Sequence, residues 1–217
     1  MDNEFGGQLM KYEWKREEKD LYLPKNKPNI VTIPKMKYFK IKGHGNPNNN
    51  PLFQEHISAL YALSYTVRMM PKKGITPNGY FEYTVYPLEG IWDLTEKGRQ
   101  EETLNKDEFL YTLMIRQPNF VNEDVFNMAL ELVKKKNNSP FINEITFEED
   151  DSYLCVHMMH IGSYDDEITS FKMMDNYVSL NGYKRMCFTH KEIYLSDFRK
   201  VEASKLKTVL RYLVKKI

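Results

Sequence analysis

The spacing of apolar residues changes along the chain between helical and alternating, and these changes predict where helices and strands lie. Apolar residues three and four positions apart predict helices over residues 52–69, 122–136 and 167–180. Asn122 is a suitable N-cap for the second helix, which has acidic residues in its first turn and lysines in its last, as the helix dipole favours. Gly182 follows the third helix as a C-terminal stop.

Runs rich in aromatic and β-branched residues predict the strands. They cover residues 30–42, 80–86, 108–116, 153–161, 186–195 and 206–214. Pro34 divides the first run, which predicts a strand pair or one bent strand. Residues 1–29 are polar and predict a lead-in with one short helix around residues 10–20, and residues 93–107 predict a polar connection.

The order strand, helix, strand, strand occurs twice, which predicts an α+β fold built from a duplicated βαββ unit. The repeats cover residues 30–120 and 150–217, with the helix over 122–136 linking them. Glu89 in PLEGIWD and Glu192 in HKEIYLSD fall at comparable places. Two halves side by side, each with its helices on one face, would leave a groove between their other faces. Chance similarity between two short α+β halves is the alternative.

Strand alternation places Glu192 on the same face as His190 and Tyr194. Ile193 and Leu195 then form the helix-facing pair, so Glu192 is expected to face the groove. A carboxylate in an apolar, ring-lined groove is costly to ionise without a partner, so it would have a raised pKa or await a cation. The alternative is a solvated glutamate on an exposed sheet face.

Composition narrows the function classes. The net charge of +1, from 31 basic and 30 acidic side chains in 217 residues, argues against a dedicated nucleic-acid-binding protein. The 15 Tyr, 12 Phe, 2 Trp and 12 Met indicate either a core of large side chains or an aromatic binding surface. No surface for a protein partner is evident.

The cysteines and the N-terminal segment indicate the compartment. Cys155 and Cys187 do not make a disulfide framework, and both thiols are expected to be free. The first 20 residues do not resemble a secretory signal, and no apolar run is long enough to cross a bilayer. We therefore expect a cytoplasmic protein with no membrane partner.

The sequence predicts no metal and no cofactor. Cys155 and His157 share a strand face, but His160 points the other way, and no second spaced pair completes a zinc site. No glycine-rich phosphate loop is present, and no cysteine is paired with a base in a recognised arrangement.

Four segments, taken in order, carry a resemblance to a known family. They are YFEYTVYPLEGIW, FLYTLMIRQPNFV, CVHMMHIGSYDDE and HKEIYLSD. From about residue 28 onward the chain resembles the GyrI-like small-molecule-binding domain, also met as the effector-binding domain of multidrug-responsive transcription activators. It is most similar to free-standing bacterial GyrI-like proteins, a subgroup that includes hydrolases of cyclopropane-bearing DNA-alkylating natural products. The resemblance implies the SHS2/GyrI-like fold, with a ligand groove between pseudo-twofold halves.

The resemblance also implies site residues. The family's glutamate corresponds to Glu192, and its aromatic wall corresponds to Phe81, Tyr83, Trp92, Tyr111 and Tyr194. Position 111 departs from the pattern, because near relatives are expected to carry Trp there. His157 and His190 complete the predicted ligand-binding set.

Two functions of different class share this site. One is a protein that binds and sequesters hydrophobic aromatic, often cationic, small molecules through ring stacking and Glu192. The other is a cofactor-independent hydrolase of cyclopropanoid genotoxins, with Glu192 activating water and Tyr83 or Tyr111 donating to the substrate carbonyl. A third hypothesis is regulation of a protein partner, since the founding member of the family is known as an inhibitor of DNA gyrase. The sequence leaves the choice open.

Overall fold

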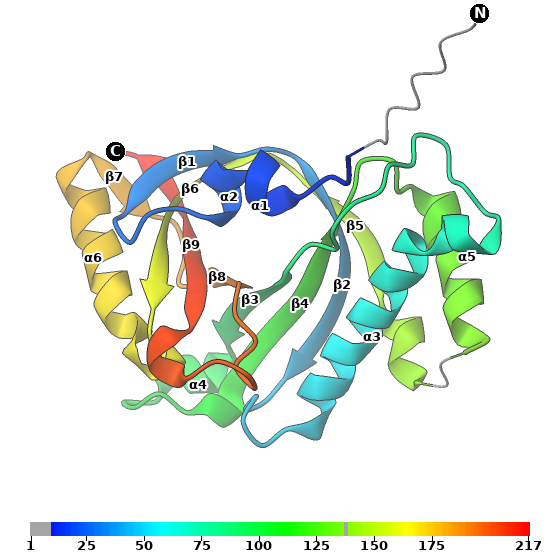
Figure 1. Ribbon diagram of the computed structural model, residues 1–217. Helices are drawn as coiled ribbons and strands as arrows, with labels where there is room; N and C mark the ends of the chain where they lie inside the picture. The colour runs from blue at the N-terminus through cyan, green and yellow to red at the C-terminus, as the bar shows by residue number, and fades with distance from the viewer. Residues whose placement is uncertain (1–9, 137–138) are drawn as a thin grey trace, which may run out of the picture.

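The computed structural model describes residues 10–136 and 139–217 and shows an antiparallel sheet flanked by helices (Figure 1). The strands are β1 (Asn29–Ile33), β2 (Met36–His44), β3 (Leu88–Leu94), β4 (Phe109–Gln117), β5 (Thr146–Asp150), β6 (Tyr153–Ile161), β7 (Tyr183–Arg185), β8 (His190–Tyr194) and β9 (Lys207–Lys216). The α-helices are α1 (Trp14–Glu17), α2 (Lys19–Tyr22), α3 (Pro51–Arg68), α4 (Glu96–Gln100), α5 (Glu123–Lys134) and α6 (Glu167–Leu180). Short 3₁₀ helices occupy Met70–Lys73, Lys106–Glu108, Pro140–Glu144, Tyr164–Asp166 and Ala203–Lys205.

The sheet is symmetric about its centre. Its strand order is β1-β6-β9-β8-β3-β4-β2-β5, with β7 paired to β9 outside this path. The strands β5 and β6 start at Thr146 and Tyr153, each 117 residues after the starts of β1 at Asn29 and β2 at Met36. The first strand of each series pairs with the other series, because β1 joins β6 and β5 joins β2. The two halves are therefore interlocked at both edges of the sheet.

The halves meet again at the middle of the sheet, where β3 pairs with β8 and Gly90 lies directly opposite Glu192. Directly opposite residues point to the same face. Trp92 and His190 therefore share the face of Glu192, while Glu89 shares the other face with Ile193. This register decides which side chains of the central strands meet.

Helices α3 and α6 stand at opposite sides of the molecule in Figure 1, and each packs on the strands of its own half. The N-cap Asn50 accepts a hydrogen bond from the backbone of Leu52 at the start of α3. The α3 half has its core at fully buried residues such as Leu60 and Leu113. The α6 half has a second core that includes Met174 and Leu210. Each helix thus buries one apolar face against its own part of the sheet.

The predicted helices are confirmed, and the strand β6 and the helix α6 match their expected bounds. Asn122 caps α5 by accepting from the backbone of Val125, as predicted. Within the lead-in, the short helices α1 and α2 lie across the top of the molecule in Figure 1. The run over 30–42 forms two separate strands, β1 and β2, on either side of Pro34, and they pair with other strands and not with each other.

Three predictions along the chain are wrong, and one strand was not predicted. Residues 80–86 do not form a strand; the rings of Phe81 and Tyr83 pack against Phe120 instead, and the strand begins after Pro87. The strand predicted over 186–195 begins only at His190. The connection over 93–107 contains α4, and β5 was not predicted. In each case tertiary contacts override the local pattern.

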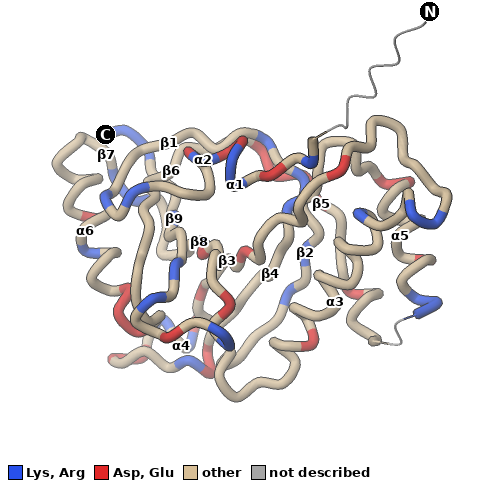
Figure 2. The backbone as a smooth tube through the Cα atoms, in the orientation of Figure 1, with Lys and Arg blue, Asp and Glu red and all other residues tan. Residues whose placement is uncertain are grey.

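Lysines and arginines are interspersed with acidic residues along both halves (Figure 2). Among the helices of residues 10–136 and 139–217, none combines the length and the hydropathy needed to cross a bilayer.

Candidate functional site

A cavity of about 1280 Å³ lies over the central strands, between α3 and α6. Rings and aliphatic side chains make up much of its wall. Examples are Phe53 and Tyr61 from α3, Phe171 from α6 and Trp92 from β3. Its volume is above the range usual for pockets that bury a drug-sized molecule, so a bulky ligand would fit.

The position of the cavity corrects the sequence prediction of a groove on the helix-free faces. Side chains of α3 and α6 line the cavity together with His190, Glu192 and Tyr194. The predicted alternation of these three residues is therefore confirmed, but they lie on the face of the sheet that carries α3 and α6. Ile193, expected to face a helix, points to the opposite face with Glu89. The helices leave the middle of the sheet uncovered, and that gap holds the cavity.

Glu192 lies on β8 with 8% of its surface exposed. Its Oε1 lies 2.9 Å from His190 Nε2. The ring of Phe171 packs edge-on against His190, with 4.9 Å between centroids. In the part of the chain that the structure describes, no lysine or arginine forms an ion pair with Glu192. A buried carboxylate without a cationic partner is suited to binding positive charge or taking up a proton.

A second carboxyl group, that of Glu167, stands beside Glu192. Glu167 is the first residue of α6, is 6% exposed and has a donor atom within 4.8 Å of one on Glu192. Burial and the neighbouring Glu192 charge raise the pKa of Glu167 well above its usual range. The positive end of the α6 dipole opposes this shift but does not cancel it.

Glu167, His190 and Glu192 present donor atoms that all lie within 4.8 Å of one another. Among the described residues, these three side chains are close enough together to bind one metal ion. The expectation of a site without metal or cofactor stays a prediction.

Tyr194 links the acidic group to the aromatic wall. The indole Nε1 of Trp92 donates a 2.7 Å hydrogen bond to the Tyr194 hydroxyl. A Cβ on Gly90 would lie only 3.0 Å from both of these polar atoms, so the contact depends on a glycine at that position. Burial, followed by the charge of Glu192, raises the pKa of Tyr194 well above its usual range. Tyr194 is therefore a neutral hydroxyl with a fixed orientation.

Tyr111 lies behind the cavity wall. Its ring fills the space over Gly43, where a Cβ would come within 2.5 Å of ring atoms, and its hydroxyl lies 3.3 Å from Nδ1 of His56. Burial raises its pKa to about 12. Tyr111 supports Trp92, with ring centroids 5.6 Å apart, but it is not among the described residues that line the cavity.

The structure does not bring Phe81, Tyr83 and His157 to the cavity lining. Phe81 and Tyr83 belong to a ring cluster around Phe120. His157 lies on β6, and burial together with the charge of Arg211 lowers its pKa to about 4. Trp92, His190, Glu192 and Tyr194 are the predicted site residues that the fold assembles. Their individual roles stay predictions.

Sequence reasoning missed Glu167, because that residue was considered only as the start of the helix predicted over 167–180. The available signal was a glutamate at the predicted helix start, directly after an acidic pair. Only the packing of α6 against β8 reveals that this carboxyl meets Glu192.

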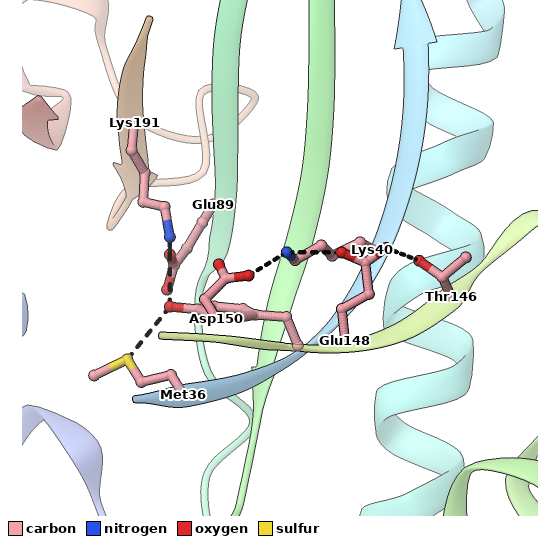
Figure 3. A network of polar contacts seen from close by, with 8 residues as sticks. Met36, Lys40, Glu89, Thr146, Glu148, Asp150 and Lys191 are labelled. Atoms are coloured by element: carbon pink, nitrogen blue, oxygen red, sulfur yellow. Dashed lines mark hydrogen bonds and ion pairs between the residues drawn. The ribbon is translucent and has the colours of Figure 1, made fainter. Parts of the chain in front are cut away.

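The opposite face of the central strands holds a different set of charges (Figure 3). Glu89 is fully buried, and its Oε2 lies 3.0 Å from Nζ of Lys191. The same ammonium group lies 3.4 Å from the Tyr38 hydroxyl and 4.6 Å from the centroid of that ring. Nearby, Lys40 pairs with Glu148 at 3.0 Å and with Asp150. These charges are compensated within the protein.

Comparison with known proteins agrees with this geometry. A sequence profile of the GyrI-like small molecule binding domain matches residues 26–214. A solved hydrolase from Listeria innocua is 32% identical, with 95% of this chain and 100% of that chain covered and a TM-score of 0.87. A further structure of a hydrolase from Listeria innocua has 32% identity, covers 94% of this chain and 100% of that chain, and gives a TM-score of 0.85.

More distant structures share the fold alone. The C-terminal domain of EcmrR is 14% identical, with 91% of this chain and 99% of that chain covered and a TM-score of 0.51. A search of curated proteins finds no match to this chain.

Proposed function

This chain belongs to the family of GyrI-like small molecule binding domains, and we propose that its cavity binds bulky aromatic or cationic molecules and hydrolyses a strained cyclopropane ring in them. The observation that carries the proposal is Glu192, a buried carboxylate without a lysine or arginine partner among the described residues, on the wall of a large ring-lined cavity. A site of this kind can recognise a ligand by its shape, its rings and its charge.

The aromatic wall supports binding of flat or multi-ring molecules. Trp92, Tyr61 and Phe171 approach the cavity from three different elements. Ring faces also attract cations, by about 0.5–2 kcal/mol for each well-placed ring. The arginines at the cavity lining are engaged elsewhere, because Arg99 pairs with Asp93 at 2.6 Å and Arg199 pairs with Asp197 at 2.9 Å. A cationic ligand would therefore meet Glu192 without competition from these groups.

The proposed reaction uses the same carboxylate as a base. Water attacks a cyclopropane carbon, the strained carbon–carbon bond breaks, and its electron pair moves to the conjugated carbonyl oxygen. Glu192 accepts the proton that the water loses. The strain of the ring supplies the driving force, so the residues of the cavity are sufficient for this step without a redox partner. The 32% identity to a hydrolase from Listeria innocua supports a hydrolytic activity.

The oxygen that gathers charge needs a donor on the cavity wall. Tyr83 and Tyr111 were predicted for this role, but Tyr111 contacts His56 and Tyr83 lies in the Phe120 ring cluster. A donor from the lining, such as Tyr194 or an acid next to Glu192, fits the geometry better.

Turnover tests the hydrolase directly. The protein is incubated with a cyclopropanoid alkylating agent, and products are followed by mass spectrometry. We expect a product that has gained one water, formed roughly 10²–10⁴ times more slowly by Glu192→Gln. The control is Glu123→Gln, which removes an exposed glutamate of α5 and should keep the native rate. Equal rates for Glu192→Gln and the native protein would contradict the assigned role.

The alternative is a protein that binds and sequesters without turnover, and the large cavity itself favours it. A lipophilic aromatic cation such as tetraphenylphosphonium, beside neutral triphenylphosphine oxide, tests the binding component by calorimetry. We expect Glu192→Gln to weaken binding of the cation and to leave binding of the neutral compound unchanged. Tight binding of the alkylating agent without any hydrated product would favour sequestration.

A further inference from the structure

The carboxyl groups of Glu167 and Glu192 lie together in the cavity, but the proposed reaction assigns a role to Glu192 alone. We propose that Glu167 and Glu192 hold one proton between them, and that Glu167 is a second catalytic residue, the acid that protonates the substrate oxygen while Glu192 activates water. The proposal rests on the proposed function of the same cavity. Both residues line that cavity, so both can touch a bound molecule.

The closeness of the two carboxyl groups favours a shared proton. Donor atoms of Glu167 and Glu192 lie within 4.8 Å of each other, and two ionised carboxylates are acceptors only, so a hydrogen bond can join them only if one is protonated. Both residues are buried, and no lysine or arginine pairs with either one among the described residues. Two negative charges this close in a buried site cannot both be kept, as in other carboxyl dyads.

The surroundings decide which carboxyl carries the proton. Glu192 Oε1 lies 2.9 Å from Nε2 of His190, which can donate a hydrogen bond to the charged form of the carboxyl. Among the described residues, the Oε1 atom of Glu167 is buried without a hydrogen-bond partner. Glu167 also lies near the neutral Tyr164 and near Asp165, whose negative charge disfavours ionisation of Glu167 and which pairs with Lys106 at 2.8 Å. The geometry therefore favours neutral Glu167 and ionised Glu192.

This arrangement completes the proposed reaction with all atoms and charges in balance. Glu192 removes a proton from water, the water oxygen bonds to the ring carbon, and the broken ring bond delivers its electron pair to the carbonyl oxygen. Glu167 gives its proton to that oxygen and becomes a carboxylate. The product then leaves with the elements of one water. The proton now on Glu192 moves across the shared hydrogen bond to Glu167, and the site is restored without another reactant.

The shared proton can be observed without any substrate. Infrared spectra of the native protein near neutral pH should contain the carbonyl band of a buried protonated carboxylic acid. We expect Glu167→Gln to lose this band and Glu123→Gln, the exposed control, to keep it. A native spectrum without the band would overturn the shared proton. A band that is present only after a metal chelator is added would overturn it as well, because the donor atoms would then hold a cation.

The catalytic role is tested by turnover of the cyclopropanoid agent and its pH dependence. We expect Glu167→Gln to bind the agent but to react about 10²–10⁴ times more slowly, with the fall of the native rate at high pH removed from its profile. A native rate with an unchanged pH profile in Glu167→Gln would overturn the role of Glu167 and leave the proposed function intact. If the native protein shows no turnover, the catalytic role fails with the proposed function, and the infrared band alone decides the shared proton.

Discussion

The central strands β3 and β8 each carry a buried glutamate, and the two residues have opposite surroundings. Glu89 faces the side of the sheet opposite α3 and α6 and pairs with Lys191 at 3.0 Å. Glu192 faces the cavity, where another acid, an imidazole and a phenol surround it. Because Gly90 lies opposite Glu192, the two glutamates are one strand position apart and point in opposite directions.

This difference distinguishes a charge that is compensated within the protein from one that we propose is available to a ligand. A buried ion pair is neutral within the protein and has little need of a ligand. A buried carboxyl pair without a cation can still bind a proton or a positive charge. The same residue type in adjacent strands thus forms an ion pair on one face of the sheet and lines the cavity on the other.

Breaking the ion pair should have the largest effect on stability. Lys191→Met leaves Glu89 buried without its partner, and we expect the free energy of unfolding to fall by about 3–5 kcal/mol. Urea unfolding measures this, with Lys184→Met as the control because Lys184 is exposed on β7. Adding Glu89→Gln to Lys191→Met should recover part of the loss. If Lys191→Met were as stable as the control Lys184→Met, the ion pair would contribute nothing to stability.

Filling the space over Gly90 should affect the cavity face alone. In Gly90→Ala the new Cβ lies 3.0 Å from Trp92 Nε1 and from the Tyr194 hydroxyl, so these groups must separate. We expect a loss of about 1–3 kcal/mol in unfolding free energy, the cost of overpacking, and weaker binding of aromatic ligands. Calorimetry of thermal unfolding and of ligand binding checks both, and native affinity would contradict the assigned position of Tyr194.

The two faces should also differ in their response to pH. The pKa of Glu167 is raised in the folded protein, so above its unfolded pKa of about 4.3 the folded state binds more protons than the unfolded state. The stability from this group is full at low pH and is lost as pH rises toward the raised pKa, by at most about 1.4 kcal/mol per pH unit. Urea unfolding between pH 5 and 8, roughly, should show this slope in the native protein and a smaller one in Glu167→Gln. Identical slopes would rule out a raised pKa for Glu167.

The smallest effect is expected at the hydrogen bond between Trp92 and Tyr194. Trp92→Phe keeps a ring in the wall but removes the donor, and we expect a loss of about 0.5–1.5 kcal/mol. A double-mutant cycle with Tyr194→Phe isolates this contact from the lost ring area. A coupling energy of zero would mean that the two groups act independently.

Local sequence patterns were enough to predict many of the helices and strands of this molecule. The spacing of apolar residues located α3, α5 and α6, and the alternation in HKEIYLSD placed His190, Glu192 and Tyr194 on one face. These features depend on neighbours close in sequence, because helix and strand geometry fix the direction of each side chain. The ring-rich segment over 80–86 misled the same reasoning, since a strand needs partners that the sequence does not reveal.

The comparison of Glu89 with Glu192 shows where sequence reasoning stopped. They were predicted to fall at matching places in PLEGIWD and HKEIYLSD, yet a difference of one position in a strand reverses the face. The prediction of Tyr83 and Tyr111 as donors also depended on direction, and Tyr111 contacts His56 behind the wall instead. Strand register and helix packing are set by contacts between distant segments, which a single sequence does not give.

The sequence by itself determined the family, the α+β class and the face on which Glu192 lies, because these follow from motifs and from local periodicity. Only the tertiary structure decided that this face is the one between α3 and α6, and that Glu167 arrives there from the first turn of α6. The physical reason is the range of the interaction. A carboxyl group acquires its proton affinity from whatever the fold brings within a few ångströms, and for Glu192 that neighbour is 25 positions away along the chain.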